Sequence, residues 1–87
     1  MRFGIIILQF AENGVVMVYK RIRDLREDRD LTQRALATAL NCSQQVYSNY
    51  ELGQRDIPTD ILIKLSEFYN VSTDYILGIT DNPKITR

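Results

Sequence analysis

The chain has 87 residues, and its 11 basic side chains balance its 11 acidic ones, so the formal net charge is zero. This length, with 45% hydrophobic residues, fits one small globular domain, for which helix packing is the simplest architecture. A neutral chain is not expected to bind nucleic acid strongly and without discrimination. The sequence has no histidine and one cysteine, Cys42, which excludes disulfide frameworks, Cys/His zinc sites and His-based catalysis.

We therefore expect no enzyme, no catalytic residue, no cofactor and no metal site. Cys42 has no histidine partner to activate it, and we expect it to pack in the core. The apolar stretch over residues 4–10 is short, contains Gln9 and lacks the small-residue cleavage site of a signal peptide. No apolar run is long enough to span a membrane. These features, with the single cysteine, indicate a cytoplasmic protein.

Residues 1–18 form a first segment, which we interpret as an N-terminal β-hairpin arm. Two apolar, β-prone runs over residues 5–12 and 15–19 flank Asn13-Gly14, a dipeptide typical of type I′ turns. The run from Ile5 to Phe10 is apolar on both faces, and a lone hairpin is marginally stable in water. Pairing with a second copy would make a homodimer. The alternative is that Met17 is the true start and that residues 1–16 are not part of the native protein.

Helical spacing begins at Val18, since Val18, Ile22 and Leu25 fall at i, i+4 and i+7, and this helix is expected to end near Arg29. Thr32 is the expected N-cap of a second helix, which should end at Asn41 with a positive φ. The apolar stripe of this second helix consists of Leu36, Ala37 and Leu40.

Ser43 is the expected N-cap of a third helix, which ends at Gly53 and has Val46, Tyr47 and Tyr50 on one side. Pro58 and Thr59 open a fourth helix that stops at Asn70. Its apolar residues are Ile61, Leu62, Leu65, Phe68 and Tyr69. Ser72 caps a last short helix, Thr73 to Leu77, which Gly78 closes. The domain predicted is all-α and covers residues 19–78, and residues 79–87 are expected to be a loose tail.

The expected helices carry three sequence stretches that resemble one known family. The stretches are Leu31-Thr32-Gln33-Arg34-Ala35-Leu36-Ala37, Cys42-Ser43-Gln44-Gln45 and Tyr50-Glu51-Leu52-Gly53-Gln54-Arg55. They resemble the helix-turn-helix of the Cro and phage-repressor family, also called the xenobiotic-response-element (XRE) type, and the likeness extends from Tyr19 to Gly78. The family usually has Gly where this chain has Asp30, Asn41 and Asn70, residues that tolerate positive φ.

The resemblance implies a five-helix, lambda-repressor-like domain in a sequence-specific transcriptional regulator, a repressor by expectation. Its partner would be a short palindromic operator in double-stranded DNA, read by a homodimer through the helix that Ser43 caps. No small-molecule substrate is expected. The alternative is a protein-interaction module, such as an antitoxin-like partner protein.

The helix that Ser43 caps should carry the base contacts. Because Tyr47 and Tyr50 occupy positions that the family buries, the residues left facing outward are Gln44, Gln45, Ser48 and Asn49. Carboxamides pair with the major-groove edge of adenine, and the N-terminal end of a recognition helix enters that groove. An ordinary polar helix face is the alternative interpretation.

The resemblance also implies phosphate contacts and one structural ion pair. Gln33 matches the family position that holds a phosphate beside the groove, at a helix N-terminus that favours anions. The other candidate phosphate contacts are Thr32, Lys20, Gln54 and Arg55. Glu51 lies in the last turn of its helix, where the helix dipole is unfavourable for a carboxylate. The family pairs arginine and glutamate at the positions of Arg26 and Glu51, so we expect that pair.

Overall fold

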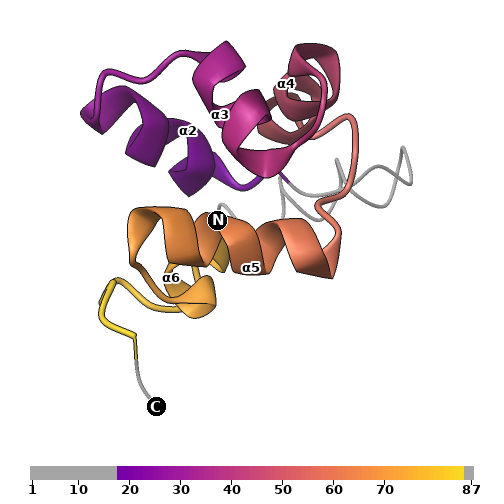
Figure 1. Cartoon of the computed structure of the whole chain (residues 1–87). Helices are drawn as coiled ribbons and strands as arrows, with labels where there is room; N and C mark the ends of the chain where they lie inside the picture. The colour runs from indigo at the N-terminus through magenta and orange to yellow at the C-terminus, as the bar shows by residue number, and fades with distance from the viewer. Residues whose placement is uncertain (1–17, 86–87) are drawn as a thin grey trace.

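A computed structural model describes residues 18–85, which form five helices (Figure 1). The helices are α2 (Lys20–Asp28), α3 (Gln33–Leu40), α4 (Gln44–Leu52), α5 (Thr59–Tyr69) and α6 (Thr73–Leu77). No strand occurs among residues 18–85, and the expected all-α class is confirmed for this part of the chain. The predicted β-hairpin lies outside the described residues except for Val18 and Tyr19, which are not in a strand.

The ends of α3, α4 and α6 follow from their capping residues. The side-chain oxygens of Thr32, Ser43 and Ser72 accept hydrogen bonds from the N–H groups of Ala35, Val46 and Tyr75, at 3.0, 3.1 and 3.0 Å. These bonds satisfy N–H groups that a helix N-terminus otherwise leaves free. The helices α3 to α6 end in left-handed residues, in chain order Asn41, Gly53, Asn70 and Gly78. The predicted caps and stops are confirmed.

The start of α2 differs from the prediction. The helix begins at Lys20, because Ile22 N–H bonds to the carbonyl oxygen of Tyr19 and so forms the first turn there. Val18 therefore precedes the helix, and 53% of its surface is exposed. Val18 does not belong to the apolar stripe in which the i, i+4, i+7 spacing placed it.

The core consists of one buried cluster to which each helix contributes. Its members are Ile22, Leu25, Leu36, Ala37, Leu40, Tyr47, Tyr50, Ile61, Leu65, Tyr69, Val71 and Ile76. Burying each large member stabilises the fold by about 1.5–3 kcal/mol relative to exposure. Phe68 is the exception to the predicted α5 stripe. It is 43% exposed and packs its ring edge-on against Tyr69 at 5.0 Å between centroids.

Two short helices, α3 and α4, lie side by side and are joined by a tight turn at Asn41 and Cys42 (Figure 1). Ala37 of α3 is only 3% exposed in the core, where a small side chain permits close packing of the helices. The helix α5 runs beneath the pair and, with α2, encloses the core (Figure 1). This packing orients α4 with one face buried and the other face outward.

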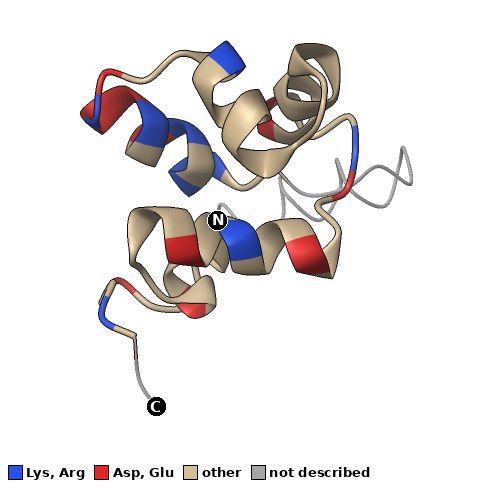
Figure 2. Cartoon of the chain, in the orientation of Figure 1, with Lys and Arg blue, Asp and Glu red and all other residues tan. Residues whose placement is uncertain are grey.

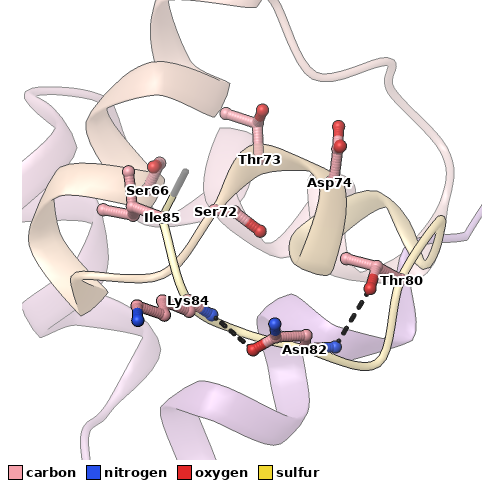
Figure 3. A pocket seen from close by; sticks show the side chains of 8 residues that line it. All are labelled: Ser66, Ser72, Thr73, Asp74, Thr80, Asn82, Lys84 and Ile85. Atoms are coloured by element: carbon pink, nitrogen blue, oxygen red, sulfur yellow. Dashed lines mark hydrogen bonds between the residues drawn. The ribbon is translucent and has the colours of Figure 1, made fainter. Parts of the chain in front are cut away.

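Residues 79–85 make more contacts with the domain than expected of a loose tail. The Ser72 N–H donates to the carbonyl oxygen of Pro83 at 2.8 Å. The Arg21 guanidinium donates to the carbonyl oxygen of Thr80 and to the Asp81 carboxylate. Figure 3 shows this segment curving past α6, with hydrogen bonds that link Thr80, Asn82 and Lys84 in series. The helices of residues 18–85 are too short and too polar to cross a membrane.

Candidate nucleic-acid interface

The outward face of α4 carries the predicted base-contact residues. Gln44 and Gln45 are exposed, whereas Ser48 and Asn49 are partly buried. On the opposite side, Tyr47 and Tyr50 are 0% and 4% exposed and meet edge to face, with ring centroids 6.4 Å apart. The two tyrosines thus pack α4 against the core. The four predicted base-contact residues share the opposite side of the helix, which faces outward.

Gln45 and Asn49, one turn apart on α4, are hydrogen-bonded through their side chains. Gln45 Nε2 donates to Asn49 Oδ1 at 3.1 Å. Neither Gln44 nor Ser48 has a side-chain hydrogen bond within residues 18–85. The polar face of α4 therefore holds one coupled pair and two separate groups.

The N-termini of α3 and α4 are electrostatically suited to an anion. Neither helix has an acidic residue in its first turn, whereas α5 and α6 have Asp60 and Asp74 there. The positive end of each helix dipole is thus not compensated by a local carboxylate. Figure 2 shows a basic residue, and no acidic residue, at the start of α3. That residue is Arg34, which is exposed and forms no ion pair within residues 18–85.

A buried ion pair joins α2 to α4. The Nε and Nη2 atoms of Arg26 donate to Oε2 and Oε1 of Glu51 at 2.7 and 3.1 Å. The two side chains are 13% and 3% exposed. Arg26 Nη1 also donates to the carbonyl oxygen of Leu31, before α3. Such a two-point arrangement fixes the guanidinium and the carboxylate relative to each other.

The same carboxylate also holds Gln33, the first residue of α3. Gln33 Nε2 donates to Glu51 Oε1 at 3.1 Å. A carboxylate only accepts, so this bond determines which end of the Gln33 carboxamide faces Glu51. The second Nε2 proton has no partner within residues 18–85. The candidate phosphate contact at α3 is therefore connected through Glu51 to α4 and to α2.

Burial and hydrogen bonding act in opposite directions on Glu51. Burial by itself would raise the pKa of the carboxyl group, but the hydrogen bond from Arg26, the nearby Tyr47 hydroxyl, the hydrogen bond from Gln33 and the Arg26 charge together hold the pKa below its ordinary value. Conversely, burial first, and then the proximity and charge of the Glu51 carboxylate, raise the pKa of Tyr47 well above its usual range. Glu51 is thus charged and Tyr47 neutral at physiological pH.

The hydroxyl groups of Tyr47 and Tyr69 are buried without a hydrogen-bond partner of good geometry within residues 18–85. Tyr47 lies near Glu51, close enough to affect its pKa, but the contact does not meet the geometry of a hydrogen bond. Burial raises the pKa of Tyr69 to about 12, against the opposing charge of Arg29. Both rings therefore act as packing groups whose polar atoms are poorly compensated.

The remaining candidate phosphate contacts lie on several different elements. Thr32 accepts the capping bond from Ala35, which leaves its hydroxyl proton free to donate. Gln54 and Arg55 are exposed in the connection that follows α4. Lys20 pairs with Asp24 at 2.8 Å and lines an open groove between the start of α2 and α6.

Arg34 was not among the sequence candidates. It lies directly after Gln33 in the first turn of α3. A basic residue beside a candidate phosphate contact could have been identified from the sequence as a further candidate. The link from Gln33 to Glu51 had no comparable signal, because it joins residues 18 positions apart.

The comparisons with known proteins match this architecture. A helix-turn-helix family model matches residues 22–76. The HTH-type transcriptional regulator ImmR of Bacillus subtilis is 49% identical over 59 residues, which make up 68% of this chain and 46% of ImmR. YobD of the same organism, described as an uncharacterized HTH-type transcriptional regulator, is 40% identical over 67 residues, covering 77% of this chain and 60% of YobD.

A more distant relative is the transcriptional repressor RstR of the cryptic phage CTXphi in Vibrio cholerae. It is 36% identical over 55 residues, covering 63% of this chain and 50% of RstR. The chain thus spans about half the length of these relatives. Among solved structures no match was found. The matched residues include α3, the turn and α4, so the chain belongs to the helix-turn-helix family, of the Cro and phage-repressor type.

Proposed function

We propose that this chain binds a short palindromic operator in double-stranded DNA and represses transcription. The observation that carries the proposal is the outward face of α4, which carries Gln44, Gln45, Ser48 and Asn49 and begins at a helix N-terminus without acidic residues. A helix of this kind fits the major groove, where carboxamides distinguish bases by their donors and acceptors. The repressor role is drawn from the name of RstR.

Contacts with phosphates would orient α4 in the groove. Gln33 offers the second proton of its Nε2, Thr32 its hydroxyl, and the start of α3 its backbone N–H groups. Gln54 and Arg55 would contact the backbone beyond the other end of α4. Lys20 would have to leave Asp24, which is inexpensive because exposed ion pairs contribute little. Neutral donors would let a chain of zero net charge bind DNA.

The decisive experiment is selection of bound sequences from a random pool of double-stranded DNA. The expected result is enrichment of a short palindrome. Replacing Gln44, Gln45 and Asn49 together by Ala should abolish the preference, and each single replacement should cost specific binding ~1–3 kcal/mol. Gln33→Ala should weaken all sequences alike. Glu67→Ala, an exposed change on α5, is the control and should alter nothing. A folded protein that enriches no sequence would instead favour the interaction module.

A palindromic operator calls for a two-fold dimer with half-sites about 34 Å apart. We propose that residues 1–18 supply the dimer contact, because their apolar run would otherwise face water. Sedimentation of the chain without residues 1–16, beside the full chain, tests this. The truncated protein should be monomeric at concentrations at which the full chain is a dimer. Equal masses at the same concentration would contradict the assignment.

A further inference from the structure

We propose that Gln45 and Asn49 read DNA as one coupled unit, with Gln45 specifying adenine and Asn49 specifying guanine. The inference rests on the proposed function and goes further, because it assigns bases to residues. Its basis is the hydrogen bond from Gln45 Nε2 to Asn49 Oδ1, 3.1 Å long, on the outward face of α4.

This hydrogen bond fixes what each carboxamide can offer. A free carboxamide has two N–H donors and one oxygen acceptor. In the pair, the oxygen of Asn49 is occupied by Gln45, so both of its Nδ2 protons remain and its acceptor is reduced. Gln45 keeps its oxygen and one Nε2 proton. Asn49 therefore presents two donors and a partly used acceptor, while Gln45 presents one donor beside one acceptor.

The orientation of the pair agrees with the electrostatics of α4. Gln45 is the second residue of the helix and Asn49 lies one turn later. With its amino group donating to Asn49, Gln45 keeps its oxygen free of that bond. Negative partial charge is favoured in the first turn of α4, since this turn contains no acidic residue. The reverse orientation would use that oxygen and leave both amino protons of Gln45 free in this turn.

The two patterns match different bases in the major groove. Adenine presents N7 as an acceptor beside the N6 amino donor, which complements the remaining groups of Gln45. Guanine presents two adjacent acceptors, N7 and O6, and no donor, so it can accept from Asn49 Nδ2 without needing the oxygen that Gln45 partly uses. An uncoupled Asn ordinarily pairs with adenine, so guanine at the Asn49 position distinguishes the coupled unit from two independent residues.

Coupling also makes the loss of Gln45 affect two base positions. Without Gln45, the Asn49 carboxamide regains its acceptor and can turn, so its preference for guanine should fall. Gln44 is the matched control, because it lies on the same face and has no side-chain hydrogen bond within residues 18–85. Gln44→Ala should change one base position only.

The test is selection from a random double-stranded DNA pool with the full-length wild type, Asn49→Asp, Gln45→Ala and Gln44→Ala, followed by fluorescence anisotropy on the enriched site. Asp at position 49 still accepts from Gln45 but has no donors. The base preferred at the position it reads should therefore change from guanine to cytosine, whose N4 amino group donates. The wild type should bind the guanine site about tenfold more tightly than the adenine site at that position. Gln45→Ala should reduce that ratio to about twofold.

A second measurement needs no DNA. In the NMR spectrum of the free protein, Asn49→Ala should shift the side-chain amide resonances of Gln45, whereas Ser48→Ala should not. Adenine at the Asn49 position, or a guanine preference that survives Gln45→Ala, would overturn the coupled unit and leave the proposed function standing. No enriched sequence from a folded wild type would overturn both.

Discussion

The γ2 methyl group of Val18 occupies the space that a side chain on Gly53 would need, since a Cβ added at position 53 would overlap it. Gly53 ends α4 with a φ of +73°. Two independent reasons therefore favour glycine here: the left-handed backbone and the packing of Val18 over the end of α4. Gly78 ends α6 with a φ of +81°, and a Cβ there would meet nothing within 4 Å.

This difference makes Gly78 a matched control for Gly53. Gly78→Ala should lower the free energy of unfolding by about 1 kcal/mol, the cost of a left-handed alanine. Gly53→Ala should lower it further, because Val18 must also move. Urea denaturation measures both values. In a Val18→Ala background the two glycine substitutions should cost the same, and a persistent difference would mean that the Val18 contact is not the cause.

The ion pair between Arg26 and Glu51 should be a major contribution to stability. Because the two side chains are 13% and 3% exposed, Glu51→Gln leaves a buried guanidinium without its charged partner. We expect a loss of ~3–5 kcal/mol in the free energy of unfolding. The control is Asp24→Asn, which breaks the exposed pair with Lys20 and should cost below about 1 kcal/mol. Comparable losses from the two variants would show that Glu51 is more hydrated than its burial implies.

Glu51 should also make the fold sensitive to acid. Its pKa in the folded protein lies below the ordinary value, so its contribution to stability is complete above the pKa of the unfolded chain, about 4.3, and is lost as the pH falls through the lower folded value. The urea midpoint should therefore decrease as the pH is lowered from about 5 to 3. In Glu51→Gln this decrease should be smaller. An equally steep decrease in the variant would assign the acid sensitivity to other carboxylates.

The helix boundaries could be predicted because local chemistry determines them. Thr32 and Ser43 accept hydrogen bonds from N–H groups three residues later, and Asn41 and Asn70 adopt left-handed backbone that few other residues tolerate. The side of α4 that faces outward was also predictable. Once the tyrosines were placed in the core, helical periodicity left the polar residues on the other side.

What the sequence did not predict depends on contacts between distant residues. Val18 matches the helical spacing but lies before α2, where it packs over Gly53. Gln33 has a position typical of a phosphate contact, yet its bond to Glu51 appears only when α3 and α4 are packed together. The tail has few apolar residues, and its anchoring depends on Arg21, about 60 positions earlier in the chain. No local pattern encodes such a pairing.

Arg21 should anchor the segment after α6 to the domain. Its Nη1 donates to the carbonyl oxygen of Tyr75 at 2.9 Å and to that of Thr80, and its Nη2 pairs with Asp81. The guanidinium carbon also lies 4.1 Å from the centroid of the Tyr75 ring. Because the Arg21 side chain is 25% exposed, the ion pair with Asp81 is partly screened, and most of the stabilisation should come from the bonds to the two carbonyl oxygens.

Arg21→Ala should lower the free energy of unfolding by about 1–3 kcal/mol, and Arg21→Lys should restore little of it, because an ammonium cannot donate to several acceptors in the guanidinium geometry. Arg23→Ala, which removes an exposed pair with Glu27 one turn along α2, is the control and should change little. Hydrogen exchange gives a local readout, since the Ser72 N–H is bonded to Pro83 in the anchored segment and should lose protection in Arg21→Ala. Removing residues 80–87 leaves the Arg21 contacts with Tyr75 in place, so the two changes together should cost more than the removal alone but less than the sum of the two separate losses. Full additivity of the two losses would show that Arg21 stabilises the domain independently of the segment.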